Sequence, residues 1–447
     1  MTISRTKKLV GVTVAAGMLI ALAGCGSAPE ETESTGDAGN VVEGFTPCLV
    51  SDDGGFNDKS FNQSAKEGMD RAAEELGVKP IEVESSSAND YAPNLENLIA
   101  EGCTFIISVG FKLSADTVAS ALANPDVNYA IIDDRADNSG ATGDDGKETG
   151  DGETDAPNIK PLLFDTVQAA YLGGYAAAAW SAEAGVNKVG TFGGIPIPPV
   201  TIFMDGFIDG VEKYNEDKGA AVETFGWDVD AQEGSMTGGF AANDTAKQTA
   251  QGILDQGVDV ILPVGGPIYQ SARDAITDAG SGTVMLGVDS DLAKADPSVA
   301  DMVLVSIMKR IDEAVYQATM EASSGDFDPA TYIGTLENEG VGLSGFGSFE
   351  SQLPEGLLDE LAALQEQIIS GDLEVTTPTP RKASRKSEAR RGGRPHPAAF
   401  FPAATTWMAP RPTAYIGCTY EARAPWDHEA FRVPRRERPH RSRGPAG

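Results

Sequence analysis

Histidine is almost absent from this chain of 447 residues, and its absence excludes several kinds of chemistry. The three histidines, His396, His428 and His440, all lie beyond residue 379, so the body of the chain has none. Ser-His-Asp and Cys-His catalysis need an imidazole base, and His-ligated zinc sites need imidazole ligands. No phosphate-binding loop, zinc-ligand spacing or nucleophile elbow appears either. We therefore expect no enzyme activity, no metal and no cofactor.

Basic residues are also scarce, and most of the chain is strongly acidic. Lys and Arg number 34 against 67 Asp and Glu, which leaves a formal net charge of -33. This excess argues against nucleic-acid binding and for a well-solvated surface. The segment 379–447 is abruptly basic and has no periodicity. One interpretation is an arm for anionic lipid or teichoic polymer. The favoured interpretation is a disordered appendage, translated out of frame or by read-through, with the true end near Pro380.

No hydrophobic run is long enough for a comfortable membrane span, and the longest one stands at the N-terminus. Arg5, Lys7 and Lys8 precede the apolar run from Leu9 to Ala23, as in a secretory signal. The exit, Leu22-Ala23-Gly24-Cys25, resembles a bacterial lipobox. It predicts a signal peptide over 1–24 and a diacylglycerol anchor on Cys25. The alternative is a plain signal anchor. Residues 25–45 hold few apolar side chains and are predicted to be a disordered tether.

Cysteines are few, and two of them remain as a candidate pair. With Cys25 lipidated and Cys418 in the tail, Cys48 and Cys103 are left in an oxidising compartment. Each stands at the start of an expected strand, and the two strands could be neighbours in one sheet. The pair could form a disulfide, or the two residues could be small buried hydrophobes.

From residue 46 to about 373, short apolar runs alternate with longer amphipathic ones. The expected strands are 47–50, 79–83, 104–109, 129–132, 188–192, 221–227, 259–264, 284–288 and 302–306. The expected helices are 60–76, 90–100, 114–123, 166–184, 203–215, 244–256, 268–279 and 309–324. This alternation predicts an α/β fold with doubly wound parallel sheets. We expect an N-terminal lobe over 46–164, completed by about 285–325, and a C-terminal lobe over 165–284, completed by about 326–373. The acidic segment 137–158 is predicted to be a surface loop between the two units.

Polar residues gather where the expected strands end. Asp52 follows the first strand, Asp133 follows 129–132, Gly265 follows 259–264 and Asp289 follows 284–288. In doubly wound sheets, ligands bind beyond the carboxyl ends of the strands. Carboxylates there suit a neutral ligand with many hydroxyl donors, and an exposed ring such as Phe61 suits a flat base. Taken singly, each Asp is more often a helix N-cap, so only their recurrence favours a site.

Several motifs, in order, resemble the basic membrane protein family of lipoproteins, which includes purine nucleoside receptors. They are Ser51-Asp52-Asp53-Gly54, Asp58-Lys59-Ser60-Phe61-Asn62-Gln63, Phe164-Asp165, Ala169 to Ala177, Gly194 to Val200, Gly287 to Asp291, and Ser306 with Lys309-Arg310. The resemblance covers about residues 46–373. It implies a type I periplasmic-binding-protein fold, in which two lobes close on a ligand like a hinge.

The resemblance also implies roles for particular residues. Phe61 and Phe240 would sandwich a purine, with Asp52, Asn62 and Asp133 near the base. Asp289 and Lys309 would hold the ribose. Gly265 would line the site, although Gly265-Gly266-Pro267 replaces the Gly-Thr-Gly turn of many relatives.

The expected function is therefore an extracytoplasmic, lipid-anchored, monomeric solute-binding protein. It would bind a nucleoside, which the resemblance implies is a purine nucleoside, and deliver it to an ABC permease at the cell membrane. The alternatives are a binder of a sugar or signalling molecule, and a ligand sensor for a membrane kinase. A hydrolase using paired Asp residues is a further and weaker alternative.

Overall fold

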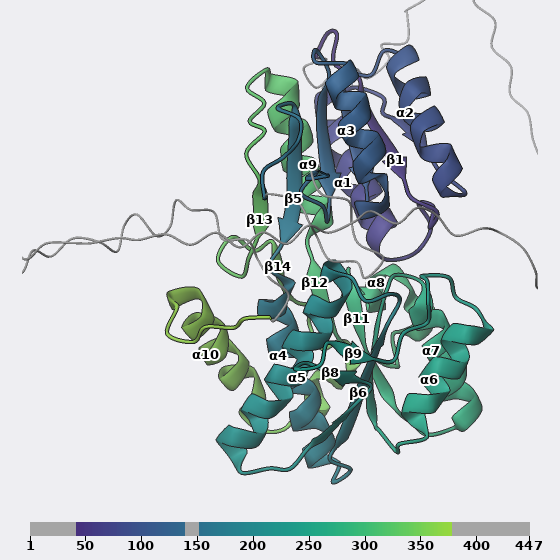
Figure 1. Cartoon of the computed structure of the whole chain (residues 1–447). Coiled ribbons are helices and arrows are strands. Elements are labelled where there is room, and N and C mark those ends of the chain that lie inside the picture. The colour runs from purple at the N-terminus through teal and green to yellow at the C-terminus, as the bar shows by residue number, and fades with distance from the viewer. Residues whose placement is uncertain (1–41, 139–151, 378–447) are drawn as a thin grey trace, which may run out of the picture. The chain divides into compact units, whose positions relative to one another are not determined.

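The first of two sheets is built from the N-terminal part of the chain. The structure is a computed structural model and describes residues 42–138 and 152–377, all within one compact unit (Figure 1). The strands are β1 (Pro47–Ser51), β2 (Ile81–Val83), β3 (Phe105–Val109), β4 (Asn128–Ile132), β5 (Ile159–Phe164) and β13 (Tyr332–Gly334). They pair in the order β13-β5-β4-β3-β1-β2, and every pairing is parallel.

The second sheet repeats the same winding. Its strands are β6 (Lys188–Gly193), β7 (Glu223–Phe225), β10 (Val260–Val264), β11 (Val284–Asp289), β12 (Val303–Lys309) and β14 (Val341–Leu343), in the order β14-β12-β11-β10-β6-β7. Only the short β14 runs antiparallel to its neighbour, β12. A two-stranded ribbon, β8 (Trp227–Asp228) with β9 (Glu233–Gly234), follows β7. In both sheets the strand order reverses beside the first strand, β1 or β6, and such a switch point is where doubly wound folds bind ligands.

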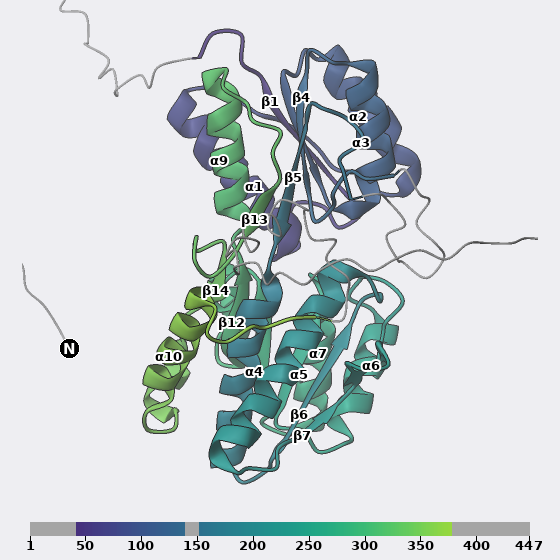
Figure 2. The ribbon, with the colours of Figure 1, turned by 60° about the vertical axis from the view of Figure 1, so that its left-hand side comes forward.

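Helices cover both faces of each sheet, as their amphipathic sequences predict. They are α1 (Phe61–Leu76), α2 (Tyr91–Ala100), α3 (Ser114–Ala123), α4 (Thr166–Glu183), α5 (Pro198–Lys218), α6 (Asp244–Leu254), α7 (Ile268–Ala279), α8 (Leu292–Ala295), α9 (Ile311–Ser324) and α10 (Leu357–Ser370). Figure 2 shows α1 and α9 on one face of the first sheet, with α2 and α3 on the other. In the second sheet, α4 and α5 lie opposite α6 and α7 (Figure 1). The predicted α/β fold with doubly wound sheets is confirmed.

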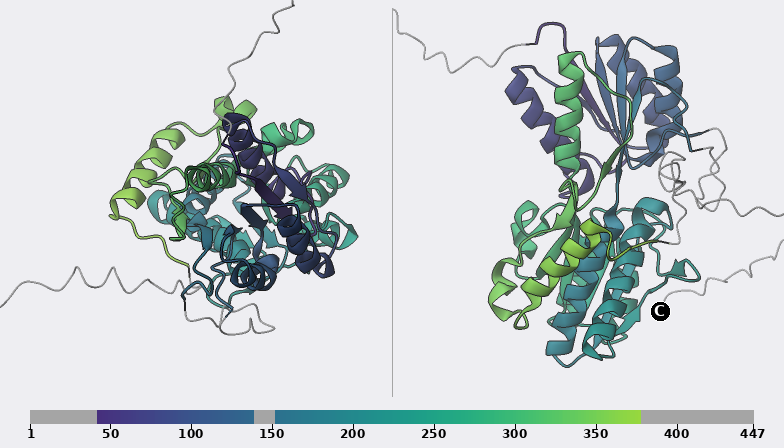
Figure 3. Two further views of the ribbon diagram at one scale, coloured as in Figure 1. Left: turned by 90° about the horizontal axis from the view of Figure 1, so that it is seen from above. Right: turned by 90° about the vertical axis from the view of Figure 1, so that its left-hand side faces the viewer.

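The term "first lobe" is used below for the first sheet with α1, α2, α3 and α9, and "second lobe" for the second sheet with α4–α8 and α10. The chain passes between the two sheets after β5, after β12 and after β13 (Figure 3). The lobe boundaries differ from those expected in two respects. Strand β13 pairs with β5 in the first sheet, whereas residues 326–373 were expected to complete the second lobe. Strand β11 pairs with β10, and β12 with β11, in the second sheet, whereas residues 285–325 were expected to complete the first lobe. From that range, α9 is the element that packs against α1.

Two further expectations need correction. The acidic segment 137–158 does not separate the lobes, because β4 and β5 on either side of it pair directly in the first sheet.

Helix α5 begins at Pro198, five residues before the expected start at Phe203. Proline is tolerated in the first turn of a helix, where its missing N–H would have no partner. The expected signal peptide, most of the tether, the lipidated Cys25 and the basic tail lie outside the described residues.

Cys48 and Cys103 form a disulfide in the structure. Cys48 lies in β1, and Cys103 lies just before β3, the strand that pairs with β1. Their Cα atoms are 6.0 Å apart, and both side chains are buried in the core between the first sheet and α2 and α3. The bridge ties together the two strands at the switch point of the first sheet.

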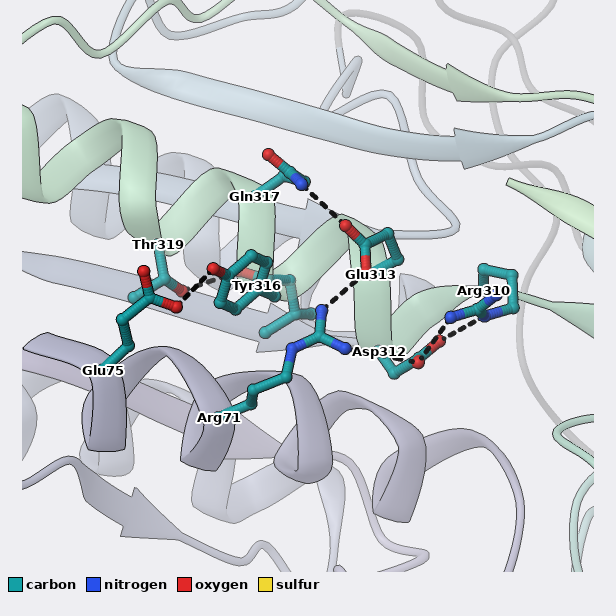
Figure 4. Close-up of polar contacts among 9 residues, drawn as sticks. Arg71, Glu75, Arg310, Asp312, Glu313, Tyr316, Gln317 and Thr319 are labelled. Atoms are coloured by element: carbon teal, nitrogen blue, oxygen red, sulfur yellow. Dashed lines mark hydrogen bonds and ion pairs between the residues drawn. The ribbon is translucent and has the colours of Figure 1, made fainter. Parts of the chain in front are cut away.

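Polar contacts on the molecular surface join α1 to α9, although the two helices lie far apart in sequence (Figure 4). Arg71 donates to Glu313 at 2.6 Å, and its guanidinium carbon lies 4.0 Å from the centre of the Tyr316 ring. The Tyr316 hydroxyl donates to Glu75 at 2.5 Å. These exposed contacts contribute little energy singly. Together they link α9 to α1. Helix α9 follows directly after β12, the strand that ends at Lys309.

Glycines bring α4 and α5 into close contact in the second lobe. A Cβ atom added to Gly174 would lie 2.0 Å from the carbonyl oxygen of Phe207, and one added to Gly210 would lie 2.0 Å from that of Tyr171. Helix α4 is buried on almost every side, and its sequence is apolar all round. The two backbones therefore approach as closely as they do because no side chain stands between them.

This contact predicts opposite effects of the same substitution at two helical glycines. Gly210→Ala should lower the free energy of unfolding by about 1–3 kcal/mol, as overpacking does in well-packed interiors. Gly252 in α6 has no atom within 4 Å of the added Cβ, so Gly252→Ala should raise the stability by about 0.5–1 kcal/mol. Denaturant unfolding of both variants measures this. Equal effects at the two positions would show that α4 and α5 are not packed in this way.

Candidate ligand-binding site

A cavity of about 570 Å³ lies at the carboxyl ends of the strands, with walls from both lobes. It is bordered by the segments that follow β1, β3 and β4 in the first lobe and β6, β10 and β11 in the second. Among the described residues, the structure brings all eight predicted ligand-binding residues to its lining: Asp52, Phe61, Asn62, Asp133, Phe240, Gly265, Asp289 and Lys309. Five carboxylates and two ammonium groups line it, because Asp53, Asp58 and Lys112 add to the predicted set.

One wall pairs Asp52 with Asn62. Asp52 follows β1, and its Oδ1 accepts from the Asn62 side chain at 3.0 Å and from the Gly54 backbone at 3.0 Å. Burial raises the pKa of the Asp52 carboxyl, and these hydrogen bonds act in the opposite direction. Asn62 is 3% exposed, and its Oδ1 has no hydrogen-bond partner in the structure. A buried acceptor without a donor is costly unless another molecule supplies one.

Asp58 has a structural role that sequence reasoning did not assign. Its carboxylate accepts the backbone N–H groups of Ser60, Asn62 and Gln63 at 2.9–3.0 Å, at the N-terminus of α1. Burial raises the pKa of Asp58, and these three hydrogen bonds lower it. Asp58 therefore anchors the turn that presents Phe61 and Asn62 to the cavity.

Lys309 makes buried ion pairs with one aspartate of each lobe. It ends β12, its side chain is 2% exposed, and its Nζ lies 2.7 Å from Oδ2 of Asp133 and 3.8 Å from Oδ1 of Asp289. The two aspartates occupy equivalent places, at the ends of β4 and β11, and both have left-handed backbones with φ of 65° and 67°. Burial raises the pKa of Asp133, whereas Lys309 lowers it. Asp133 thus contacts the same ammonium group as Asp289, although the resemblance places the two near different parts of a ligand.

The two predicted rings come from different lobes. Phe61 begins α1, and Nζ of Lys309 lies 5.3 Å from the centre of its ring. Phe240 follows β9, and its ring lies against the backbone at Gly194 and Gly265, where an added Cβ would come within 2.5 and 2.9 Å of it. These positions therefore need glycine for the ring to sit where it does. Nζ of Lys112 lies 5.2 Å from the centre of the Phe240 ring.

Lys112 and an apolar wall are the lining features that sequence reasoning missed. Lys112 follows β3 and pairs with Asp53. Nothing in its local sequence distinguishes it from a surface lysine. The apolar wall consists of Ile195, Ile197, Pro199, Val200 and Phe203 around the start of α5. The proline-rich segment after β6 could have predicted this wall, because it follows a strand at the edge of the sheet where ligands bind.

Two doubly wound lobes, linked by three crossings and enclosing a cavity at their strand ends, are the construction of a type I solute-binding protein. A solved structure described as an ABC transporter solute-binding protein from Aeropyrum pernix K1 matches with a TM-score of 0.60 and 27% identity, over 75% of this chain and 94% of that one.

Family membership follows from the sequence comparison. The family model described as ABC transporter substrate-binding protein PnrA-like matches residues 45–377, so the chain belongs to this family. The ABC transporter nucleoside-binding protein BmpA of Lactococcus lactis is 27% identical, over 83% of this chain and 99% of its own length. Basic membrane protein A1 of Borrelia garinii is 28% identical, over 72% and 86%. The predicted likeness to the basic membrane proteins is confirmed. The family consists of ABC transporter substrate-binding proteins, not enzymes.

No helix among the residues that the structure describes is both long and apolar enough to cross a membrane.

Proposed function

We propose that this protein binds a nucleoside, specifically a purine nucleoside, in the cavity between its lobes and delivers it unchanged to an ABC permease. The observation that carries the proposal is the unpaired, buried Oδ1 of Asn62 beside Asp52 and Phe61. A base edge with N–H groups would donate to these oxygens while its face stacks on the ring.

The charges of the cavity support an uncharged ligand with several donors. Five carboxylates against two ammonium groups disfavour an anion and provide acceptors for hydroxyl groups. Asp289 and Lys309 together offer an acceptor and a donor to a sugar. The relative from Lactococcus lactis, described as the ABC transporter nucleoside-binding protein BmpA, agrees with this choice.

A ligand screen by calorimetry and thermal unfolding tests the proposal. At about 100 times its dissociation constant, a bound ligand stabilises the folded state by about 2.7 kcal/mol. Purine nucleosides should raise the melting temperature of the full chain, whereas pyrimidine nucleosides, free pentoses and purine nucleotides should do so less or not at all. A shift produced by sugars and not by nucleosides would leave the family intact and replace the ligand.

We also propose that the chain is held at the outer face of the cell membrane by a lipid on Cys25. The support is the Leu22-Ala23-Gly24-Cys25 motif after the apolar run. Lipidation adds apolar chains that anchor a protein without a membrane-spanning helix. Cys25→Ser should move the protein from the membrane fraction to the soluble fraction, and an unchanged distribution would contradict the anchor.

A further inference from the structure

Ser60 stands at the N-cap of α1 but does not cap the helix. Serine at this position usually accepts a backbone N–H of the first helical turn through its hydroxyl. Here the side chain of Ser60 makes no capping hydrogen bond, and the carboxylate of Asp58 accepts the N–H groups of Asn62 and Gln63 instead. The hydroxyl of Ser60 therefore does not make the capping hydrogen bond that its position predicts.

The hydroxyl of Ser60 instead contacts the second lobe. Oγ of Ser60 donates to Oδ2 of Asp289 at 2.7 Å, and the carbonyl oxygen of Val288 lies further away, at 3.3 Å. Ser60 and Asp289 are 2% and 5% exposed, so water competes little for this bond. Since a hydroxyl has a single proton to donate, the shorter, charge-assisted bond to Asp289 is favoured.

A second contact between the same two turns keeps them in register. The hydroxyl of Ser290 donates to the carbonyl oxygen of Lys59 at 3.3 Å. Lys59 and Asp289 both have left-handed backbones, with φ of 61° and 67°, which residues other than glycine seldom adopt. Such conformations persist where the surroundings hold them, and they are common at ligand sites.

We propose that Ser60 is a positioning residue that orients Asp289 for the sugar hydroxyls of the ligand, an inference that rests on the proposed nucleoside function. With Oδ2 held by Ser60, rotation of the carboxylate is restricted, and Oδ1 lies 3.8 Å from Nζ of Lys309, which also lines the cavity. Oδ1 is then ready to accept from a ribose hydroxyl. Because Ser60 belongs to the first lobe, Asp289 is fully oriented only when the lobes are together.

The test compares ligands that differ only in the sugar. For a purine nucleoside, Ser60→Ala in the full chain should weaken binding about tenfold, as the loss of one well-placed hydrogen bond to a charged group does. For the 2′,3′-dideoxy form of the same nucleoside, the variant should change the dissociation constant by less than about twofold, because the hydroxyls that Asp289 would bind are missing. Ser60→Thr keeps the hydroxyl and should bind like the natural protein.

Ser64→Ala is the matched control. Ser64 lies one turn further along α1, is 3% exposed, and its backbone N–H donates to the carbonyl oxygen of Ser60. This variant should leave binding of both ligands unchanged. If Ser60→Ala does not fold, Ser60→Cys, which keeps the size and offers a weak donor, should show the same selective loss.

Each outcome separates this inference from the proposed function. Equal weakening of both ligands, or no weakening of either, overturns the positioning role while nucleoside binding stands. A natural protein that binds sugars or other ligands and no nucleoside overturns the proposed function itself.

Discussion

A double variant, Phe61→Ala with Phe240→Ala, is expected to abolish detectable nucleoside binding while leaving the fold intact. Stacking of a base on an aromatic ring contributes about 1–3 kcal/mol, so each single variant should weaken binding by about 5- to 150-fold. The rings come from different lobes and line one cavity, so the double variant should weaken binding more than either single variant. Calorimetric titration with a purine nucleoside measures all three variants.

Two phenylalanines outside the cavity serve as controls for this result. Phe45 in the first lobe packs near Phe105, and Phe225 in β7 packs on the core of the second lobe. Phe45→Ala and Phe225→Ala should lower stability without changing the affinity for the nucleoside. Affinity that stays within about threefold in the double variant would exclude stacking, since each ring is expected to contribute at least about fivefold.

The predictable strands are those whose sequences are continuous apolar runs. The runs that became β1, β3, β4, β10 and β11 are buried throughout or nearly so, and parallel strands covered on both faces read as continuous apolar segments. Strand β5 was missed because Pro161 interrupts it and an acidic segment precedes it. The edge strands β13 and β14, with three residues each, were also missed.

The positions of the candidate ligand residues were predictable for a related reason. A residue that directly follows a buried parallel strand must lie at the sheet's carboxyl edge, so Asp52, Asp133 and Gly265 were placed by the strands themselves. The partnership of each residue was not predictable. That Ser60 reaches Asp289 and that Lys112 lies near Phe240 both depend on contacts between segments whose sequence spacing carries no such information.

The sheet that the strands after residue 285 join could not be predicted for the same reason. Alternation of strands and helices is the same on both sides of residue 285, so nothing local says which sheet β11 and β12 join. The pairing of β11 with β10, and of β12 with β11, decides it. This pairing also brings Lys309 to the end of a second-lobe strand, from where it reaches Asp133 in the first lobe. The interlobe ion pair between Lys309 and Asp133 therefore follows from the topology.

Lys309→Met is expected to lower the free energy of unfolding by about 3–5 kcal/mol, the typical effect of removing one partner of a buried ion pair. Lys309 is 2% exposed, and the variant leaves the carboxylates of Asp133 and Asp289 facing each other without a cation. Adding Asp133→Asn should recover part of this loss, because it removes one of the two charges. Lys218→Met is the control. Lys218 pairs with Glu360 on the surface, and loss of an exposed pair changes stability by about 0–1 kcal/mol.

The pH dependence of the Lys309→Met variant identifies the group responsible. Burial raises the pKa of Asp133, and Lys309 opposes this rise. In the variant, the pKa of Asp133 should therefore rise further above the unfolded value of about 3.9. The folded state then binds more protons than the unfolded state between these two pKa values, and stability falls as pH rises through that window. The deficit relative to the natural protein should therefore be larger at about pH 8 than at about pH 5. Asp133→Asn in the same chain should remove most of this difference. A deficit that is equal at both pH values would mean that Asp133 is not the carboxylate that Lys309 keeps charged.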